Sequence, residues 1–233
     1  MIYEMSRYNA PGDYHNSIGI KSQDAVFSKV NERKCCIALA DGAGSRRNAY
    51  EGAEFSVRII CEYIFDNLDD LFSMETYQLK KTLADYIYSK LTELAHSNST
   101  LAYTYASTLL CFAADEHRFL MFHIGDGAAF VQRKNSWNVL SFPNGLSADK
   151  TYLTTSADPK PFVICGEMND IESVALISDG ILTNIFYDNF VPKINCTEIQ
   201  EILKQGASMP HTDDVSYIFC KIIRGKNDGT EKI

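Results

Sequence analysis

The sequence predicts an α+β fold in which helices are layered on sheets. Short apolar or β-branched runs bounded by turn residues, which are typical of strands, occur in both the first and the last part of the chain. Two longer, adjacent segments with the apolar spacing of amphipathic helices lie between them. This order differs from the regular alternation of strand and helix that builds a doubly wound parallel sheet.

The expected strands are short segments, and the two long helices each carry one apolar stripe. The strands are predicted at 25–30, 35–40, 119–124, 128–132, 174–177 and 216–223. Apolar residues recur at helical spacing from Ala49 to Ile64 and again from Leu79 to Leu94. Each of these helices is therefore expected to pack one face on a sheet.

A third helix is indicated near the C-terminal end of the chain. Thr197 is followed three residues later by Gln200, which is the capping-box arrangement. Ile199, Ile202 and Leu203 supply an apolar face, and Gly206 is expected to end the helix.

Composition indicates one packed domain that works in a reducing compartment. The chain has 233 residues, of which 45% are hydrophobic and 22% charged, close to the globular average. Its seven cysteines form no Cys-x-x-Cys pair, which favours free thiols and a cytoplasmic location. The polar N-terminus lacks the apolar stretch of a signal peptide, and the longest apolar run, 35–40, is too short to cross a membrane. A net charge of −8 disfavours nucleic acid as a partner.

Acidic residues stand at the ends of several expected strands. Apolar runs end in Asp41-Gly42, Asp126-Gly127 and Asp179-Gly180, and the pair Asp213-Asp214 precedes the last strand. A single Asp-Gly is more simply read as a hairpin turn. Three strand-ending copies and an acidic pair instead predict carboxylates that converge on rigid backbone at the rim of a sheet.

Such a cluster of carboxylates requires cations. Two unpaired carboxylates within about 4 Å repel by roughly 4 kcal/mol even at an effective dielectric constant near 20. An all-oxygen ligand set favours Mg²⁺ or Mn²⁺ over Zn²⁺, which prefers His and Cys. Two such ions about 3.5–4 Å apart can bind a bridging hydroxide and stabilise an in-line displacement at phosphorus.

Ordered motifs of the chain resemble those of the type 2C, metal-dependent (PPM) protein serine/threonine phosphatases. The motifs are Ser22-Gln23-Asp24-Ala25, Asp41-Gly42-Ala43-Gly44-Ser45, Ala106-Ser107-Thr108, Gly125-Asp126-Gly127, Ser178-Asp179-Gly180 and Asp213-Asp214-Val215-Ser216. The resemblance runs from about His15 to Ile222. It is closest to the compact bacterial-type branch, in which a His precedes a Gln-Asp-Ala element.

The resemblance implies a fold and an activity. The fold would be a four-layer α-β-β-α sandwich of two stacked, mainly antiparallel sheets flanked by helices. One phosphatase-like domain would span residues 1–233, with a core at about 13–224. The activity would be hydrolysis of phosphoserine and phosphothreonine with two Mn²⁺ or Mg²⁺ ions and a weaker third. A phosphorylated protein would be the substrate, and a serine/threonine kinase the functional counterpart.

The resemblance also assigns roles to the acidic residues. The implied metal-binding set is Asp24, Asp41, Gly42, Asp126, Asp179 and Asp213. Asp41 would bridge both ions, Asp179 and Asp213 would complete one of them, and these three carry catalysis. The Gly42 carbonyl and a water-mediated link near Gln23 and Asp24 would complete the other ion. Asp126 would join Asp179 at the third ion, and Asp214 is the alternative to Asp213.

Two functional groups of the family lack an obvious counterpart. Many members carry a His inside the Asp-Gly-x-Gly motif that protonates the leaving oxygen, whereas this chain has Ala43. His15, His123 and a metal-bound water are the alternatives, because histidine exchanges protons near neutral pH.

Larger relatives also grip phosphate with an Arg before the first acidic element. In this chain the candidates for binding substrate phosphate are Lys21, Arg46 and His15. Arg46 and the adjacent Arg47 are read as ordinary solvated charges at even odds.

Two rival functions remain open. The chain could be a catalytically weak or inactive phosphatase-like domain that binds a kinase or a phosphoprotein. It could also be a two-metal hydrolase of another phosphoester, although the acidic balance disfavours a nuclease. The retained acids favour an active enzyme.

Overall fold

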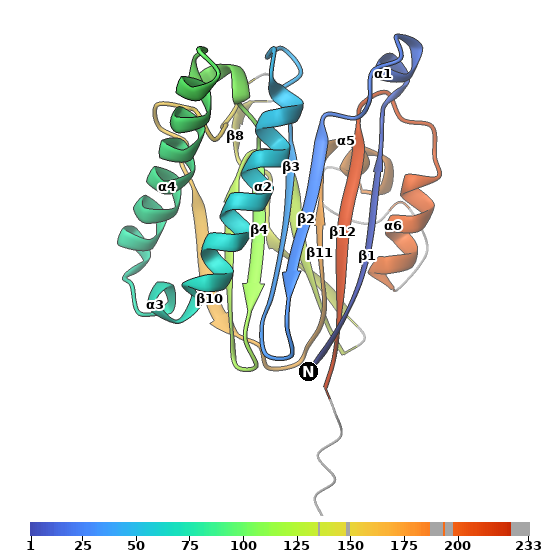
Figure 1. Ribbon diagram of the computed structural model, residues 1–233. Coiled ribbons are helices and arrows are strands. Elements are labelled where there is room, and N and C mark those ends of the chain that lie inside the picture. The colour runs from blue at the N-terminus through green and yellow to red at the C-terminus, as the bar shows by residue number, and fades with distance from the viewer. Residues whose placement is uncertain (135, 148–149, 187–192, 194–197, 225–233) are drawn as a thin grey trace, which may run out of the picture.

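Two five-stranded antiparallel sheets stack on each other in the computed structural model, which describes residues 1–134, 136–147, 150–186, 193 and 198–224 (Figure 1). The first sheet has the order β1 (Ile2–Ala10), β12 (Val215–Ile223), β11 (Ile171–Ile177), β6 (Ala128–Arg133) and β7 (Ser136–Ser141). The second has the order β10 (Phe162–Glu167), β5 (Arg118–Ile124), β4 (Leu109–Ala114), β3 (Cys35–Asp41) and β2 (Asp24–Val30).

Helices cover the outer face of each sheet (Figure 1). The second sheet carries α2 (Ala49–Asp66), α3 (Leu68–Phe72) and α4 (Thr76–Ser97), and the first carries α5 (Asp179–Ile185) and α6 (Ile199–Ala207). Short elements complete the connections: α1 (Asp13–Ser17), the 3₁₀ turn at Ala102–Tyr105, and the small hairpin of β8 (Gly145–Ser147) and β9 (Lys150–Thr151). The four-layer α-β-β-α sandwich expected from the sequence is confirmed.

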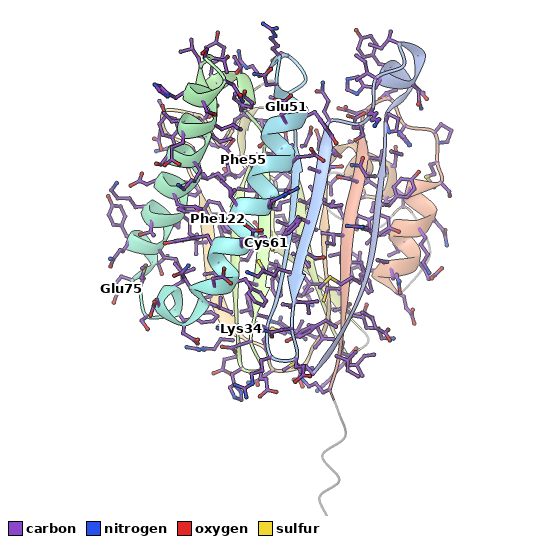
Figure 2. All side chains as sticks on the ribbon, viewed as in Figure 1. Lys34, Glu51, Phe55, Cys61, Glu75 and Phe122 are labelled. Carbon is purple, nitrogen blue, oxygen red and sulfur yellow. The ribbon has the colours of Figure 1, made fainter. Side chains whose placement is uncertain are left out.

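Three apolar layers hold the sandwich together. Strand β3 shows how they form, because Cys35, Ile37 and Leu39 face the layer between the sheets, while the residues that alternate with them face α2. A strand buried on both faces reads as a continuous apolar run, as 35–40 does. Figure 2 shows Cys61 and Phe122 in the layer between the second sheet and its helices.

The expected strands and long helices are confirmed, but several elements were not anticipated. The observed strands contain every predicted segment and extend each of them by one to three residues. Strand β4 was missed because Leu-Leu-Cys-Phe-Ala-Ala has neither alternation nor β-branched residues. Strand β1 was missed because it is a half-exposed edge strand that pairs with β12 across almost the whole chain.

The predicted boundaries of the third helix need correction. Helix α6 begins at Ile199 after Glu198, and the proposed cap Thr197 lies outside the described residues. Gly206 does not end the helix, which continues to Ala207. A Cβ at Gly206 would lie 2.0 Å from Cγ2 of Ile185, so this glycine serves the packing of α6 on α5. In the described part of the chain, no helix combines the length and the apolar character needed to cross a bilayer.

The position of Leu176 in the layer between the sheets predicts a large loss of stability when its side chain is shortened. Leu176 on β11 is fully buried between the sheets. Leu176→Ala is expected to lower the free energy of unfolding by about 2–5 kcal/mol, through lost transfer energy and a cavity. Glu172→Ala, at an exposed position of the same strand, should change it by less than about 0.5 kcal/mol. Urea denaturation measures both, and equal effects would contradict the assigned layer.

Candidate metal centre

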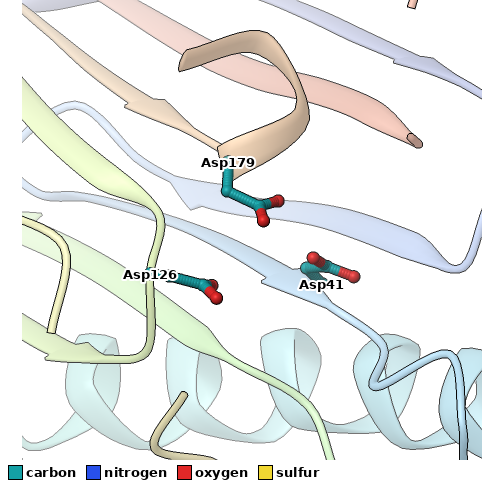
Figure 3. Close-up of side chains that lie close together, drawn as sticks. All are labelled: Asp41, Asp126 and Asp179. Carbon is teal, nitrogen blue, oxygen red and sulfur yellow. The ribbon is translucent and has the colours of Figure 1, made fainter. Parts of the chain in front are cut away.

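Three of the strand-end acids converge at one end of the sandwich. Asp41 is the last residue of β3, Asp126 lies in the turn between β5 and β6, and Asp179 is the first residue of α5 after β11. One carboxylate oxygen from each lies within 4.8 Å of the others. Figure 3 shows the three side chains pointing toward a common centre. The acids of Asp41 and Asp179 come from different sheets, so the cluster bridges the sandwich.

A cavity of about 440 Å³ opens over this cluster. Its lining residues come from segments far apart in the sequence: His15, Gln23, Asp41, Gly42, Ala43, Gly44, Ser45, Arg46, Thr108, Asp126, Thr151, Leu153, Asp213 and Asp214. Asp41, Asp126 and Asp213 therefore face one space, as the sequence predicted. The backbone of Asp41 is fixed there by Thr108, whose N–H donates to the Asp41 carbonyl at 2.8 Å and whose Oγ1 accepts from the Asp41 N–H at 2.9 Å.

Gly180 allows two of the acidic segments to meet. A Cβ at this position would lie 2.0 Å from the backbone oxygen of Asp214. Any other residue would push the start of α5 away from the segment that carries Asp213. The glycine after Asp179 thus serves close approach of a neighbouring backbone, rather than a hairpin turn.

Asp24 lies beside the cluster but beneath the cavity. It is the cross-strand partner of Asp41 and is 1% exposed. Neither of its carboxylate oxygens has a hydrogen-bond partner in the described part of the chain, and the same holds for Oδ1 of Asp179 and Oε1 of Gln23. Gln23, not Asp24, lines the cavity. Buried oxygens without donors are costly unless a cation satisfies them, so this donor set fits Mg²⁺ or Mn²⁺.

Burial and mutual repulsion raise the pKa values of the clustered acids. Loss of solvent raises the pKa of Asp41 well above its usual range, and the charges of Asp24 and Asp179 add to the effect. Burial is the main cause that raises the pKa of Asp24 to about 6, and the charge of Asp214 raises it further. Burial and the charges of Asp126 and Asp213 raise the pKa of Asp179 to about 7. Without cations the cluster therefore retains protons.

Hydrogen bonds distinguish the two acids of the Asp213-Asp214 pair. Asp214 is 3% exposed, and both of its carboxylate oxygens accept hydrogen bonds, from Gly12 N, His15 Nδ1 and Gln23 N. The carboxylate of Asp213 accepts only from the N–H of Asp214, at 2.8 Å, among the described residues. This arrangement favours Asp213 as the acid available to an ion, and gives Asp214 the role of organising the loops around it.

The fold places the basic side chains that are candidates for binding phosphate in different cavities. Arg46 lines the cavity, and its guanidinium lies 5.5 Å from the ring centroid of Tyr103. Arg47 lines a different cavity, with Glu51. Lys21 lines a neighbouring cavity of about 500 Å³ rather than that of the acids. Among the described residues that line the acidic cavity, Arg46 is the only lysine or arginine.

His123 is placed away from the chemistry. It is completely buried on β5, and its Nδ1 lies 2.6 Å from Oγ of Ser141. Burial lowers its pKa to about 3, so the ring is neutral near pH 7. It does not line the acidic cavity.

The structure adds residues that the sequence did not single out. Thr151, at the end of β9, donates a hydrogen bond from its Oγ1 to Oδ2 of Asp126, and Leu153 lines the same cavity. The segment 143–161 showed only turn-forming and polar composition, which carries no information on what it contacts. Its link to Asp126 is a tertiary contact without a sequence pattern.

Comparison with known proteins agrees with this geometry. The family described as Protein phosphatase 2C matches residues 11–211, and the chain belongs to this family. No curated protein matches the sequence closely enough to be significant.

Solved structures share the fold at low sequence identity. A variant of a bacterial serine phosphatase superposes with a TM-score of 0.69 at 17% identity, covering 97% of this chain and 100% of the other. Serine/threonine phosphatase Stp1 from Staphylococcus aureus gives 0.67 at 15% identity, covering 96% of each chain. The catalytic domain of serine threonine protein phosphatase PstP, in complex with two manganese ions, gives 0.67 at 14% identity, covering 95% and 99%.

The raised pKa of Asp179 predicts a pH-dependent stability of the metal-free protein. Its pKa is about 7 in the fold against a usual 3.8, so its contribution to stability is lost as the pH rises between these values. In chelator, Asp179→Asn should therefore melt a few degrees above the wild type at about pH 8, and this advantage should shrink at about pH 5. Scanning calorimetry measures both differences.

An exposed acid serves as the control for this comparison. Asp85→Asn, on the exposed face of α4, should show no such pH-dependent gain. A melting difference between Asp179→Asn and the wild type that is the same at both pH values would contradict the assigned repulsion.

Proposed function

We propose that this chain is a metal-dependent phosphoprotein phosphatase that hydrolyses phosphoserine and phosphothreonine. The observation that carries the proposal is the convergence of Asp41, Asp126 and Asp179 at one centre, with Asp213 facing the same cavity. Membership of the protein phosphatase 2C family supports it. In this proposal Asp41, Asp179 and Asp213 carry the catalytic ions.

The cofactors would be two Mn²⁺ or Mg²⁺ ions. Asp41 would contact both, Asp179 and Asp213 would hold one, and Gly42 with the Gln23-Asp24 segment would serve the other. Asp126 would join Asp179 around a weaker third ion. Bound there, the ions would supply an activated water and neutralise charge on the phosphoryl group. The protein contributes rigid strand ends that fix the ligand positions and a cavity that receives the phosphorylated side chain.

The proposed partner is a phosphorylated protein, and a serine/threonine kinase would supply that phosphoprotein. Arg46 is the cavity residue suited to gripping the phosphate dianion, because guanidinium forms forked hydrogen bonds with phosphate oxygens. The net charge of −8 disfavours a nucleic-acid substrate. The six cysteines in the described residues are free, and this supports our placing the protein in the cytoplasm.

A second candidate function rests on one departure from the family. Ala43 lines the cavity where many members carry a histidine. A phosphatase-like domain that binds a kinase or phosphoprotein without turnover would be compatible with this residue. The retained acids favour the enzyme, because a pure binding function does not require carboxylates to be gathered at a cost in repulsion.

The proposed function predicts metal-dependent turnover. Purified protein with Mn²⁺ should release phosphate from a phosphothreonine peptide, and excess chelator or Asp179→Asn should lower kcat/KM by about 100-fold or more, since charge stabilisation of this kind is worth about 10²–10³ in rate. Asp85→Asn, on the exposed face of α4, is the matched control and should retain activity.

Two outcomes would contradict the proposed enzymatic activity. Undiminished turnover in chelator would remove the metal mechanism. Tight binding of a phosphoprotein with no phosphate release, under any of the metal conditions, would establish the binding domain instead.

The separation of Arg46 from Arg47 predicts different kinetic effects. Arg46→Ala should raise KM for the phosphopeptide by about tenfold, because a charge-assisted hydrogen bond to phosphate contributes about 1.5–3 kcal/mol. Arg47→Ala, which changes the adjacent residue in another cavity, should leave KM within about twofold. Steady-state kinetics on both variants decides, and equal effects would refute the assignment of Arg46.

A further inference from the structure

His15 faces the acidic cavity without belonging to the acidic cluster. It lies in the short helix α1 and lines the acidic cavity together with Asp41 and Asp213. Its side chain is 16% exposed, so the ring is largely enclosed but still reaches the cavity. Residues 11–15 arrive there from the end of β1, in the first sheet, whereas Arg46 follows β3 of the second sheet.

A buried carboxylate orients the His15 ring. Nδ1 of His15 lies 2.7 Å from Oδ1 of Asp214, which also accepts the N–H of Gly12 at 2.8 Å. The other oxygen of Asp214 accepts the N–H of Gln23 at 2.6 Å. Asp214 is thus fixed by two backbone groups, and an acceptor-only carboxylate requires Nδ1 of the ring to carry the hydrogen. Nε2 has no hydrogen-bond partner among the described residues and is the ring nitrogen left for a ligand.

Phosphoester hydrolysis needs a proton at this cavity. When the bond between phosphorus and a serine or threonine oxygen breaks, the oxygen leaves as a strongly basic alkoxide unless it receives a proton. Ala43 cannot donate one, and His123 is buried elsewhere. Among the described residues that line the cavity, His15 is the only histidine, and imidazole is the side-chain group that most often serves as a general acid.

We infer that His15, held by Asp214, donates the proton to the leaving serine or threonine oxygen. The inference rests on the proposed phosphatase function and adds a catalytic residue to it. Water attacks phosphorus, the phosphorus–oxygen bond to the side chain breaks, and its electron pair stays on the leaving oxygen. The proton on Nε2 of the charged ring passes to that oxygen. The proton lost by the attacking water restores the ring, so that the products are the free hydroxyl and hydrogen phosphate.

Asp214 is a positioning residue in this scheme. Its bond to Nδ1 fixes the direction of Nε2, as a carboxylate behind a histidine does in other hydrolytic sites. The chain therefore replaces a proton donor in the Asp-Gly-x-Gly turn with one delivered by the α1 segment. The contact between Asp214 and His15 spans 199 positions of the sequence.

The test compares two leaving groups. His15→Asn keeps a side-chain N–H near the position of Nδ1 but has no acidic proton to give. Its kcat should fall about 10²–10³-fold on a phosphoserine peptide, the usual contribution of a general acid. On p-nitrophenyl phosphate, whose nitrophenolate leaves without a proton, kcat should fall by less than about tenfold. Asp214→Asn should show the same selectivity with a smaller loss.

Controls separate this role from a structural one. His96→Asn, at the exposed end of α4, should leave both activities at wild-type values. Equal losses on the two substrates in His15→Asn, or no loss on phosphoserine, overturn the inference while the phosphatase function stands. A wild-type protein that turns over neither substrate overturns the proposed function and the proton donor together.

The orientation of the His15 ring by Asp214 can also be measured without substrate turnover. Two-bond ¹H–¹⁵N NMR of the metal-free protein, at a pH where its five histidines are neutral, should show His15 with the hydrogen on Nδ1. The signal is assigned by its loss in His15→Asn. In Asp214→Asn the ring should revert to a mixture of tautomers. A wild-type ring with its hydrogen on Nε2 overturns the assigned orientation.

Discussion

Electrostatic repulsion among buried carboxylates is the constraint on which this site depends. The fold places Asp24 opposite Asp41 on paired strands and brings Asp179 to the same point from the other sheet. Loss of solvent and mutual charge raise the pKa values of all three, and several of their oxygens have no donor within the described residues. The proposed cations would offset this repulsion, so one requirement accounts for both the acids at the strand ends and the cavity beside them.

The segments around the acids position the other polar groups of the cavity. Both carboxylate oxygens of Asp214 are hydrogen-bonded, to Gly12, His15 and Gln23. These bonds join the N-terminal segment to the start of the last strand, beside the clustered acids. Arg46 approaches from the turn after β3. Among its described lining residues, the cavity therefore combines several carboxylates with the guanidinium of Arg46 and the oriented imidazole of His15. With the proposed cations on the carboxylates, this set of groups would suit an anionic phosphate monoester more than a neutral ligand.

Local patterns in the sequence were enough to predict six of the strands, the two long helices and the convergence of strand-end acids, whereas the four-layer arrangement was implied by the family resemblance. Strand β3 is a continuous apolar run, and helix α2 has apolar residues at helical spacing. An acid that ends a buried strand must lie at the rim of the sheet. Strand β4 has no such pattern and is defined by its neighbours. The contact of Asp214 with His15 and the separation of Arg46 from Arg47 could not be predicted, because adjacent or distant residues in the chain acquire their surroundings only through tertiary packing.

The apolar layer between the sheets also sets the distance between two acids of the proposed metal site. Asp41 continues a strand on one side of this layer and Asp179 continues a strand on the other, so the thickness of the packed side chains between them sets how far apart the two carboxylates stand. Protein interiors are too densely packed to absorb extra volume without moving backbone. A larger side chain at Leu39 is therefore expected to change the distance between these two carboxylates, and with it the preference of the proposed metal site for cations of different radius, without changing any proposed ligand.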